Sequence, residues 1–193
     1  MPPVKNAIKK IKVLLFVLIL TITPFFKGTT FFEKTALAKQ ETSPSYSSPV
    51  SILIPKIELE AKIEPVGLDE KNNMIIPAEK NKVGWYKYGK KPGENGNAVI
   101  AGHNVWTYGQ AVFYRLNEIQ KDDLIFVKYE DGSTNIFKVE RVILDKIENF
   151  EVNEIFVGNT DKKRLILITC AGDYKKEIRT FDKRLVVYST LLE

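Results

Sequence analysis

Short runs of apolar and β-branched residues, bounded by Gly, Pro, Asn or Asp, most constrain the fold of this chain. Runs of this length are typical of strands and are too short for stable isolated helices. Asp131-Gly132 between two of them is a typical hairpin turn. We therefore predict an all-β domain, a closed barrel or sandwich of about eight strands. The predicted strands are residues 51–55, 61–66, 74–77, 97–102, 124–130, 134–142, 165–169 and 184–189.

One segment shows helical periodicity. In residues 111–119, Val112, Leu116 and Ile119 recur at spacings of four and three, which places them on one face of a helix. We expect one or two short helices in the whole domain. The single cysteine excludes an intramolecular disulfide, so the fold depends on its core, and about 145 residues are enough for one.

The net charge of +5 belongs to the amino-terminal region. Residues 1–48 contain seven Lys and two Glu, whereas the remaining 22 basic and 22 acidic residues cancel. A neutral domain gives no general basic surface for a polyanion, so we expect no nucleic-acid partner.

The amino-terminal region has the features of an export signal. Four lysines precede the apolar residues 13–23, and Ala36-Leu37-Ala38 resembles a cleavage site. We expect residues 1–38 to be a signal peptide or, slightly favoured, an uncleaved membrane anchor. Because the positive flank stays inside, the rest would lie on the extracellular face of the cytoplasmic membrane. Residues 39–50 are predicted to be a flexible Ser/Pro spacer and residues 51–193 the folded domain.

A lone thiol, a lone imidazole and a guanidinium flank predicted strands. Cys170 follows residues 165–169, His103 follows the predicted strand that ends at Gly102, and Arg184 begins the last predicted strand. These are the groups of a thiolate acyl-transfer site, in which the imidazole moves protons and the guanidinium stabilises an oxyanion. Each also has a structural interpretation: a buried cysteine, a structural histidine or a solvated arginine. Arg179 is a second candidate for the guanidinium.

No cofactor is expected, and metal binding is disfavoured. The acidic residues could supply oxygen ligands to calcium, but they lack a loop motif of fixed spacing. Neither a second histidine nor a second cysteine is available for zinc. The acidic residues considered are Asp122, Asp123, Glu130, Asp131, Glu148, Glu151 and Glu154.

Taken together, these motifs resemble those of the sortase family, the cysteine transpeptidases of the Gram-positive cell surface. The family's Thr-Leu-x-Thr-Cys signature is similar to residues 166–170, where Ile166 departs from the first Thr. The family's histidine strand matches residues 98–103, and its arginine strand matches residues 182–187. The resemblance extends from about residue 52 to residue 191 and includes segments 84–86, 92–94, 96–98 and 113–116.

The resemblance implies an eight-stranded β-barrel and a ping-pong reaction. Cys170 would attack the Thr–Gly bond of a Leu-Pro-x-Thr-Gly-like sorting motif on a surface protein, giving a thioacyl enzyme. His103 would transfer protons, and Arg184 would hold the motif or the oxyanion. Thr169 would orient the substrate or donate to the oxyanion, and an apolar segment containing Ile147, Phe150 and Ile155 would bind the Leu-Pro part of the motif.

The acyl acceptor is open between a peptidoglycan-precursor amine, which would anchor surface proteins, and a pilin lysine, which would polymerise pilins. Anchoring is favoured, because the sequence has no Asp-Pro-Trp or Asp-Pro-Phe triplet of pilin-polymerising members. The domain is therefore similar to the compact classes D, E or F. The alternatives are a hydrolytic cysteine protease and a non-enzymatic surface barrel that binds wall polymers.

Overall fold

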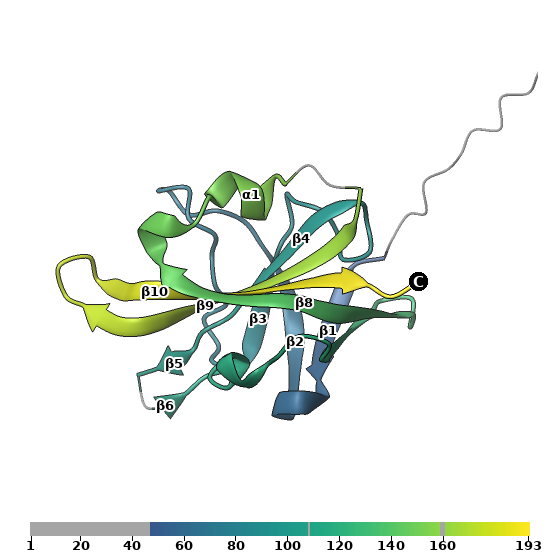
Figure 1. The fold of residues 1–193 in the computed structure, drawn as a ribbon, viewed down its shortest axis with the longest axis horizontal. Coiled ribbons are helices and arrows are strands. Elements are labelled where there is room, and N and C mark those ends of the chain that lie inside the picture. The colour runs from purple at the N-terminus through teal and green to yellow at the C-terminus, as the bar shows by residue number, and fades with distance from the viewer. Residues whose placement is uncertain (1–46, 108, 159–160) are drawn as a thin grey trace, which may run out of the picture. The chain divides into compact units, whose positions relative to one another are not determined.

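A computed structural model describes residues 47–107, 109–158 and 161–193, which form a closed eight-stranded barrel (Figure 1). The order around the barrel is β1-β2-β3-β4-β9-β10-β8-β7, and β5 and β6 form a separate two-stranded sheet. The strands are β1 (Pro49–Ile54), β2 (Leu59–Val66), β3 (Lys82–Tyr86), β4 (Gly96–Ala101), β5 (Val105–Trp106), β6 (Gly109–Gln110), β7 (Leu124–Tyr129), β8 (Thr134–Lys146), β9 (Lys163–Lys175) and β10 (Thr180–Leu191). The predicted all-β barrel is confirmed.

The helical segments in the described residues are short. They are the 3-10 turns η1 (Pro55–Ile57), η2 (Leu116–Glu118) and η3 (Ile147–Asn149), and the α-helix α1 (Val152–Phe156). The prediction of a helix over residues 111–119 is wrong except for the 3-10 turn η2. The amides of Tyr114, Leu116 and Ile119 donate to carbonyls three residues earlier, so this segment is a series of tight turns that includes η2 and not an α-helix.

Two further details differ from the sequence prediction. Residues 74–77 form no strand and make only an isolated bridge between Met74 and Leu68. Strand β3 was not predicted, because Gly84 interrupts its short apolar pattern. The glycine is required there, since a Cβ on Gly84 would lie 2.9 Å from the Val66 side chain.

Successive side chains of a strand point to opposite faces of the barrel wall, and part of this wall is buried on both faces. Leu165, Leu167 and Leu185 point into the barrel, whereas Ile166 and Val186 point outward and pack with Ile155 of α1. Every residue of β4 is buried, as predicted for a strand covered on both sides. The outer face of β4, β9 and β10 is therefore a second core that α1 covers.

Strands β9 and β10 run on as a hairpin that extends past the barrel (Figure 1). Cys170 and Arg184 were predicted to lie at strand ends, but both lie inside these strands. The hairpin is irregular, which explains the error: Gly172 has a φ of 78°, and the register shifts between Phe181 and Lys183. The sequence of this part of the hairpin is therefore similar to that of a loop.

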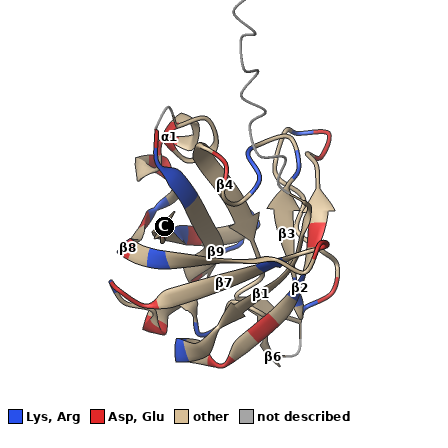
Figure 2. Ribbon diagram, turned by 90° about the vertical axis from the view of Figure 1, so that its right-hand side faces the viewer, with Lys and Arg blue, Asp and Glu red and all other residues tan. Residues whose placement is uncertain are grey.

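Acidic and basic residues are interspersed along the strands and loops of the barrel (Figure 2), in keeping with the neutral domain. Strand β1 begins at Pro49, two residues before the predicted start of the folded domain at residue 51. Within the described ranges, no helix has the length and apolar content needed to cross a bilayer. The predicted leader, residues 1–38, lies outside the described residues.

The core of β8 gives a prediction with a control on the same strand. Phe137 is fully buried and Leu144 is 55% exposed. We expect Phe137→Ala to lower the free energy of unfolding by about 3–5 kcal/mol, because it leaves a cavity. Leu144→Ala should cost less than about 1 kcal/mol. Urea denaturation measures both values, and equal losses would contradict this description of the core.

Candidate active site

Cross-strand pairing places the thiol opposite the guanidinium. Cys170 on β9 and Arg184 on β10 are direct partners in the antiparallel register. Directly opposed residues carry their side chains on the same face, with Cβ atoms about 5 Å apart. Ile168 and Val186 continue this outer face toward the second core.

His103 lies two residues past the end of β4, beside the cysteine strand. Three hydrogen bonds fix this placement: the Gly102 amide to the Ile168 carbonyl (3.2 Å), the Thr169 hydroxyl to the Gly102 carbonyl (2.8 Å), and the Asn104 side-chain amide to the Cys170 carbonyl (2.9 Å). The segments that carry the imidazole and the thiol are thus bonded to each other on both sides of His103.

Glycine is required before the histidine. A Cβ on Gly102 would lie 2.8 Å from both the Phe113 ring and the Val112 side chain. Any larger residue would push the chain away from these two side chains and move His103 with it.

The backbone orients the imidazole. Nε2 of His103 lies 3.2 Å from the carbonyl oxygen of Pro77, and a carbonyl can only accept, so Nε2 carries a proton. Nδ1 is then the lone-pair nitrogen of the neutral ring. Trp106 packs edge-on against the ring with centroids 4.9 Å apart. Burial lowers the pKa of His103 below its ordinary value of 6.5, and the Pro77 hydrogen bond opposes this shift.

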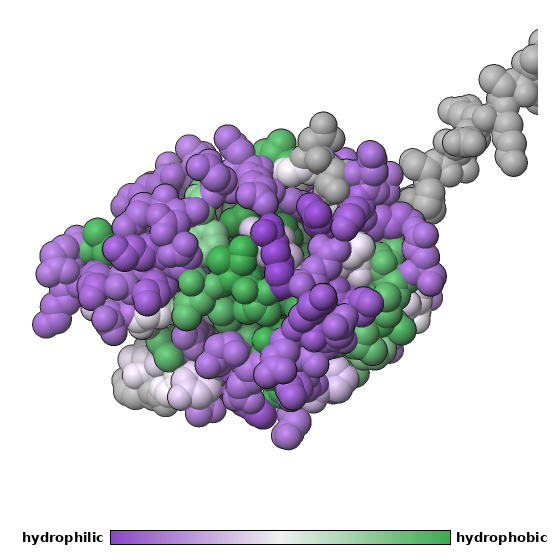
Figure 3. All heavy atoms as spheres, viewed as in Figure 1, coloured by the Kyte–Doolittle hydropathy of each residue, from purple (hydrophilic) through white to green (hydrophobic). Residues whose placement is uncertain are grey.

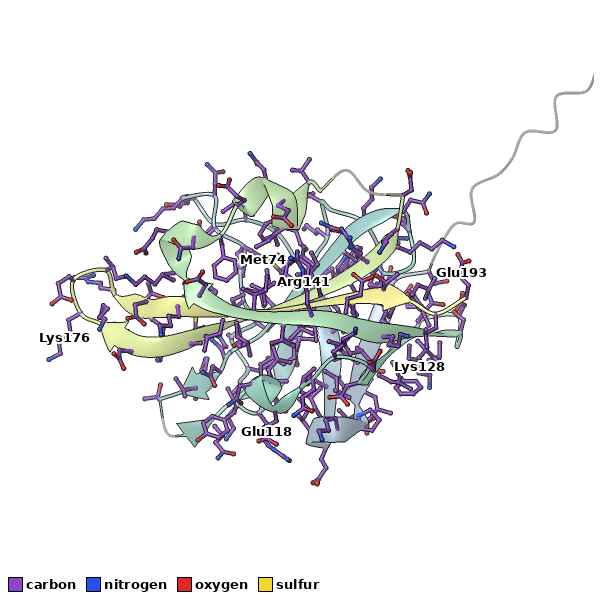
Figure 4. The ribbon with its side chains drawn as sticks, viewed as in Figure 1. Met74, Glu118, Lys128, Arg141, Lys176 and Glu193 are labelled. Atoms are coloured by element: carbon purple, nitrogen blue, oxygen red, sulfur yellow. The ribbon has the colours of Figure 1, made fainter. Side chains whose placement is uncertain are left out.

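The guanidinium of Arg184 is held by the hairpin. It donates to the carbonyls of Phe181 (3.0 Å) and Lys183 (2.8 Å) and to the Thr180 hydroxyl (3.2 Å). These bonds reduce the freedom of a long side chain, and Arg184 lines the same groove as Cys170. Arg179 instead lies at the exposed hairpin turn, near the tip marked by Lys176 (Figure 4).

Cys170, His103 and Arg184 line one groove with a volume of about 530 Å³. One wall is formed by η3 and α1 and the other by the loop between β2 and β3. The wall residues are Leu68, Asn72, Asn73, Met74, Ile76, Ile147, Phe150, Val152, Ile155 and Phe156. The face drawn in Figure 3 also gathers apolar side chains below α1, surrounded by hydrophilic ones. The groove is therefore suited to an apolar peptide segment.

All four residues predicted to contact substrate also line this groove. Ile147 lies in η3, Ile155 in α1 and Phe150 between the two. Thr169 is buried, and its hydroxyl proton is engaged by the Gly102 carbonyl. In this arrangement the hydroxyl orients the chain before Cys170, and direct donation to a substrate would require breaking that bond.

Sequence reasoning missed the groove wall between β2 and β3. Asp69 organises this loop, because its carboxylate accepts from the amides of Lys71 and Asn73 and from the Asn73 side chain. An Asp followed by two Asn in a polar stretch is a turn signal that could have identified the loop, although not its position beside the groove. Among the described residues, no group of three or more His, Cys, Asp or Glu is placed to hold a metal ion.

The structure therefore defines the class of protein as a closed β-barrel with an apolar groove that is lined by a cysteine, a histidine and an arginine. The family model for the sortase domain matches residues 52–192. The chain therefore belongs to the sortase family.

Solved structures share the fold at low identity. Sortase A from Corynebacterium diphtheriae has a TM-score of 0.57 and 20% identity, with 77% of this chain and 62% of that chain covered. Sortase C-1 from Actinomyces oris has a TM-score of 0.57 and 23% identity, with coverage of 75% and 71%. Sortase C from Streptococcus pneumoniae has a TM-score of 0.56 and 19% identity, with coverage of 76% and 67%. No curated protein matched the chain.

The environment of His103 predicts its titration. Because burial disfavours the charged ring, we expect a pKa below 6.5 and a neutral imidazole at pH 7. On acidification the unfolded state binds a proton first, so the free energy of unfolding should fall as the pH drops from about 6.5 through the lower folded value. Proton NMR of the only histidine measures this pKa directly. A value above 6.5 would contradict the prediction.

Proposed function

We propose that this sortase is a cysteine transpeptidase that cleaves a Leu-Pro-x-Thr-Gly-like sorting motif between Thr and Gly. It would transfer the acyl group to a cell-wall amine and so anchor surface proteins. The observation that supports this most directly is that Cys170, His103 and Arg184 line the same apolar groove.

The proposed reaction begins with a neutral His103, in keeping with its lowered pKa. The imidazole takes the thiol proton of Cys170, and the thiolate attacks the threonine carbonyl. Collapse of the tetrahedral intermediate breaks the Thr–Gly bond, and the imidazolium gives its proton to the departing glycine amine. An incoming amine then attacks the thioester and loses a proton to His103, and Cys170 leaves as a thiol.

Arg184 would stabilise the oxyanion in both steps. Its guanidinium is held by carbonyls of the hairpin. A charge that is already in place needs no rearrangement as the oxyanion forms. The apolar walls at Ile147, Phe150 and Ile155 would bind the Leu-Pro part of the motif.

A separate approach to the thioester is available to the acceptor. A second hollow of about 460 Å³ borders Thr169 and Cys170 and is lined also by Asn104, Tyr114 and Asn117. An amine could therefore approach the acylated Cys170 while the donor segment occupies the first groove. We place the reaction on the extracellular face of the cytoplasmic membrane, because the sequence of residues 1–38 has the features of an export signal or anchor.

A pilin lysine is the alternative acceptor, because the structurally similar sortase C from Streptococcus pneumoniae has pilin substrate specificity. Hydrolysis by water is the second alternative. Incubation with a sorting-motif peptide, with and without an amine acceptor, separates these reactions by intact-mass analysis. Ligation to a cell-wall peptide amine supports anchoring, whereas ligation only to a pilin lysine peptide supports polymerisation. Cleavage unaffected by any amine indicates a protease, and no adduct at all indicates a non-enzymatic binder.

Loss of the thiol should abolish the reaction. We expect Cys170→Ala to form no thioacyl adduct with a sorting-motif peptide, because no other cysteine is present. Intact-mass spectrometry detects the adduct in the wild-type protein. Turnover by the variant at the wild-type rate would remove Cys170 from the reaction.

The two arginines of the hairpin provide a matched comparison. Arg184 lies opposite Cys170, whereas Arg179 is exposed at the turn. We expect Arg184→Ala to lower kcat/KM by about 10²–10³-fold, the usual effect of removing an oxyanion donor, and Arg179→Ala to change it little. Peptide-cleavage kinetics measure both. Loss of activity in the Arg179 variant alone would assign the guanidinium role to Arg179.

A further inference from the structure

The apolar groove wall depends on a helix too short to be stable alone. Helix α1 has five residues, Val152–Phe156, and isolated helices of this length do not persist in water. It nevertheless supplies Val152, Ile155 and Phe156 to the groove. Tertiary contacts must therefore hold it against the barrel.

A buried amide on β4 provides the main polar contact. Asn97 is 3% exposed, and its Nδ2 donates to the carbonyl oxygens of Glu154 (2.8 Å) and Ile155 (3.2 Å). These are carbonyls of the last turn of α1, which has no following turn to supply donors. Because both partners can only accept, they fix which end of the side-chain amide faces the helix.

The oxygen of the same side-chain amide is buried at a cost in free energy. Oδ1 of Asn97 is buried without a hydrogen-bond partner among the described residues. An unsatisfied buried acceptor is unfavourable, so burial alone gives no reason for an asparagine on this strand. The side chain is instead accounted for by the two bonds that its other end makes to α1.

Gly158 packs against the hydrogen bond between Asn97 and the Glu154 carbonyl. A Cβ at this position would lie 2.3 Å from Nδ2 of Asn97 and 2.6 Å from the carbonyl oxygen of Glu154. The backbone of Gly158 also closes the helix end, since its amide donates to the Asn153 carbonyl at 3.0 Å. The close approach of α1 to β4 therefore depends on the absence of a side chain here.

A surface contact adds a weaker tether. Arg141 on β8, labelled in Figure 4, donates to the Glu154 carboxylate at 3.1 Å. Its guanidinium lies 4.0 Å from the centroid of the Tyr188 ring. About half of the Arg141 side chain is exposed, so solvent screens this pair. The buried amide is the stronger constraint.

We propose that Asn97 is a positioning residue that holds α1 on β4 and thereby fixes the apolar wall of the donor groove. It lies six residues before His103, about 20 Å along the strand, and so acts through α1 and not on the reacting atoms. This inference rests on the proposed function in one respect: the groove must bind the Leu-Pro end of a donor peptide. Asn97 would then determine the affinity for that end and not the rate of bond cleavage.

The test compares Asn97→Leu and Gly158→Ala with Asn153→Ala in the full-length protein. The first two variants disturb the contact from opposite sides, and the third removes an exposed amide from the same helix. With a Leu-Pro donor peptide, we expect the KM to rise about tenfold in the first two, with kcat within about twofold of the wild-type value. A peptide with Ala-Ala in place of Leu-Pro should show no such difference. A fall in kcat at unchanged KM would overturn the proposal.

Hydrogen exchange tests the contact independently of activity. The amides of Ile155, Val157 and Gly158 close the turns at the two ends of α1 by donating to the carbonyls of Glu151 and Asn153. We therefore expect them to exchange faster in Asn97→Leu and Gly158→Ala than in Asn153→Ala. Unchanged exchange in both variants would overturn the proposal. If the wild-type protein does not react with any donor peptide, the proposed function fails, and the exchange rates alone decide whether Asn97 holds α1.

Discussion

The hydrogen-bonded pairing of β9 with both of its neighbours is the constraint on which the site depends. Pairing with β10 puts Cys170 opposite Arg184, and pairing with β4 brings the chain that leads to His103 alongside. The three groups come from distant parts of the sequence, yet their relative positions follow from strand register. A shift by one residue would turn the side chain of Cys170 to the inner face of the barrel.

The candidate reactive groups stand out in the sequence because each is chemically distinctive. A single thiol, a single histidine and an arginine at the start of a β-branched run left few alternatives, and their order matches the sortase motifs. The strand assignments succeeded where the runs were β-branched, as in β4 and β9. They failed at residues 74–77, which form only an isolated bridge between Met74 and Leu68, and at β3, whose short apolar pattern Gly84 interrupts.

The groove walls could be predicted only in part. Apolar residues such as Ile147, Phe150 and Ile155 indicate a binding segment, but the opposite wall is a polar loop whose shape comes from the carboxylate of Asp69. Its position beside the groove, and that of the Asn97 amide beneath α1, result from pairings between distant strands. Local sequence patterns carry no information about such contacts, since each residue type there is also common in ordinary turns and strands.

The Pro77 carbonyl has a consequence for how the ring works through a full cycle. Its hydrogen bond occupies Nε2 in the neutral and in the charged form alike, so protons enter and leave only at Nδ1. The imidazole can therefore alternate between the two forms without a ring flip. In the proposed reaction, both half-reactions would then use a single nitrogen, held at one position by a backbone atom that no side-chain substitution removes.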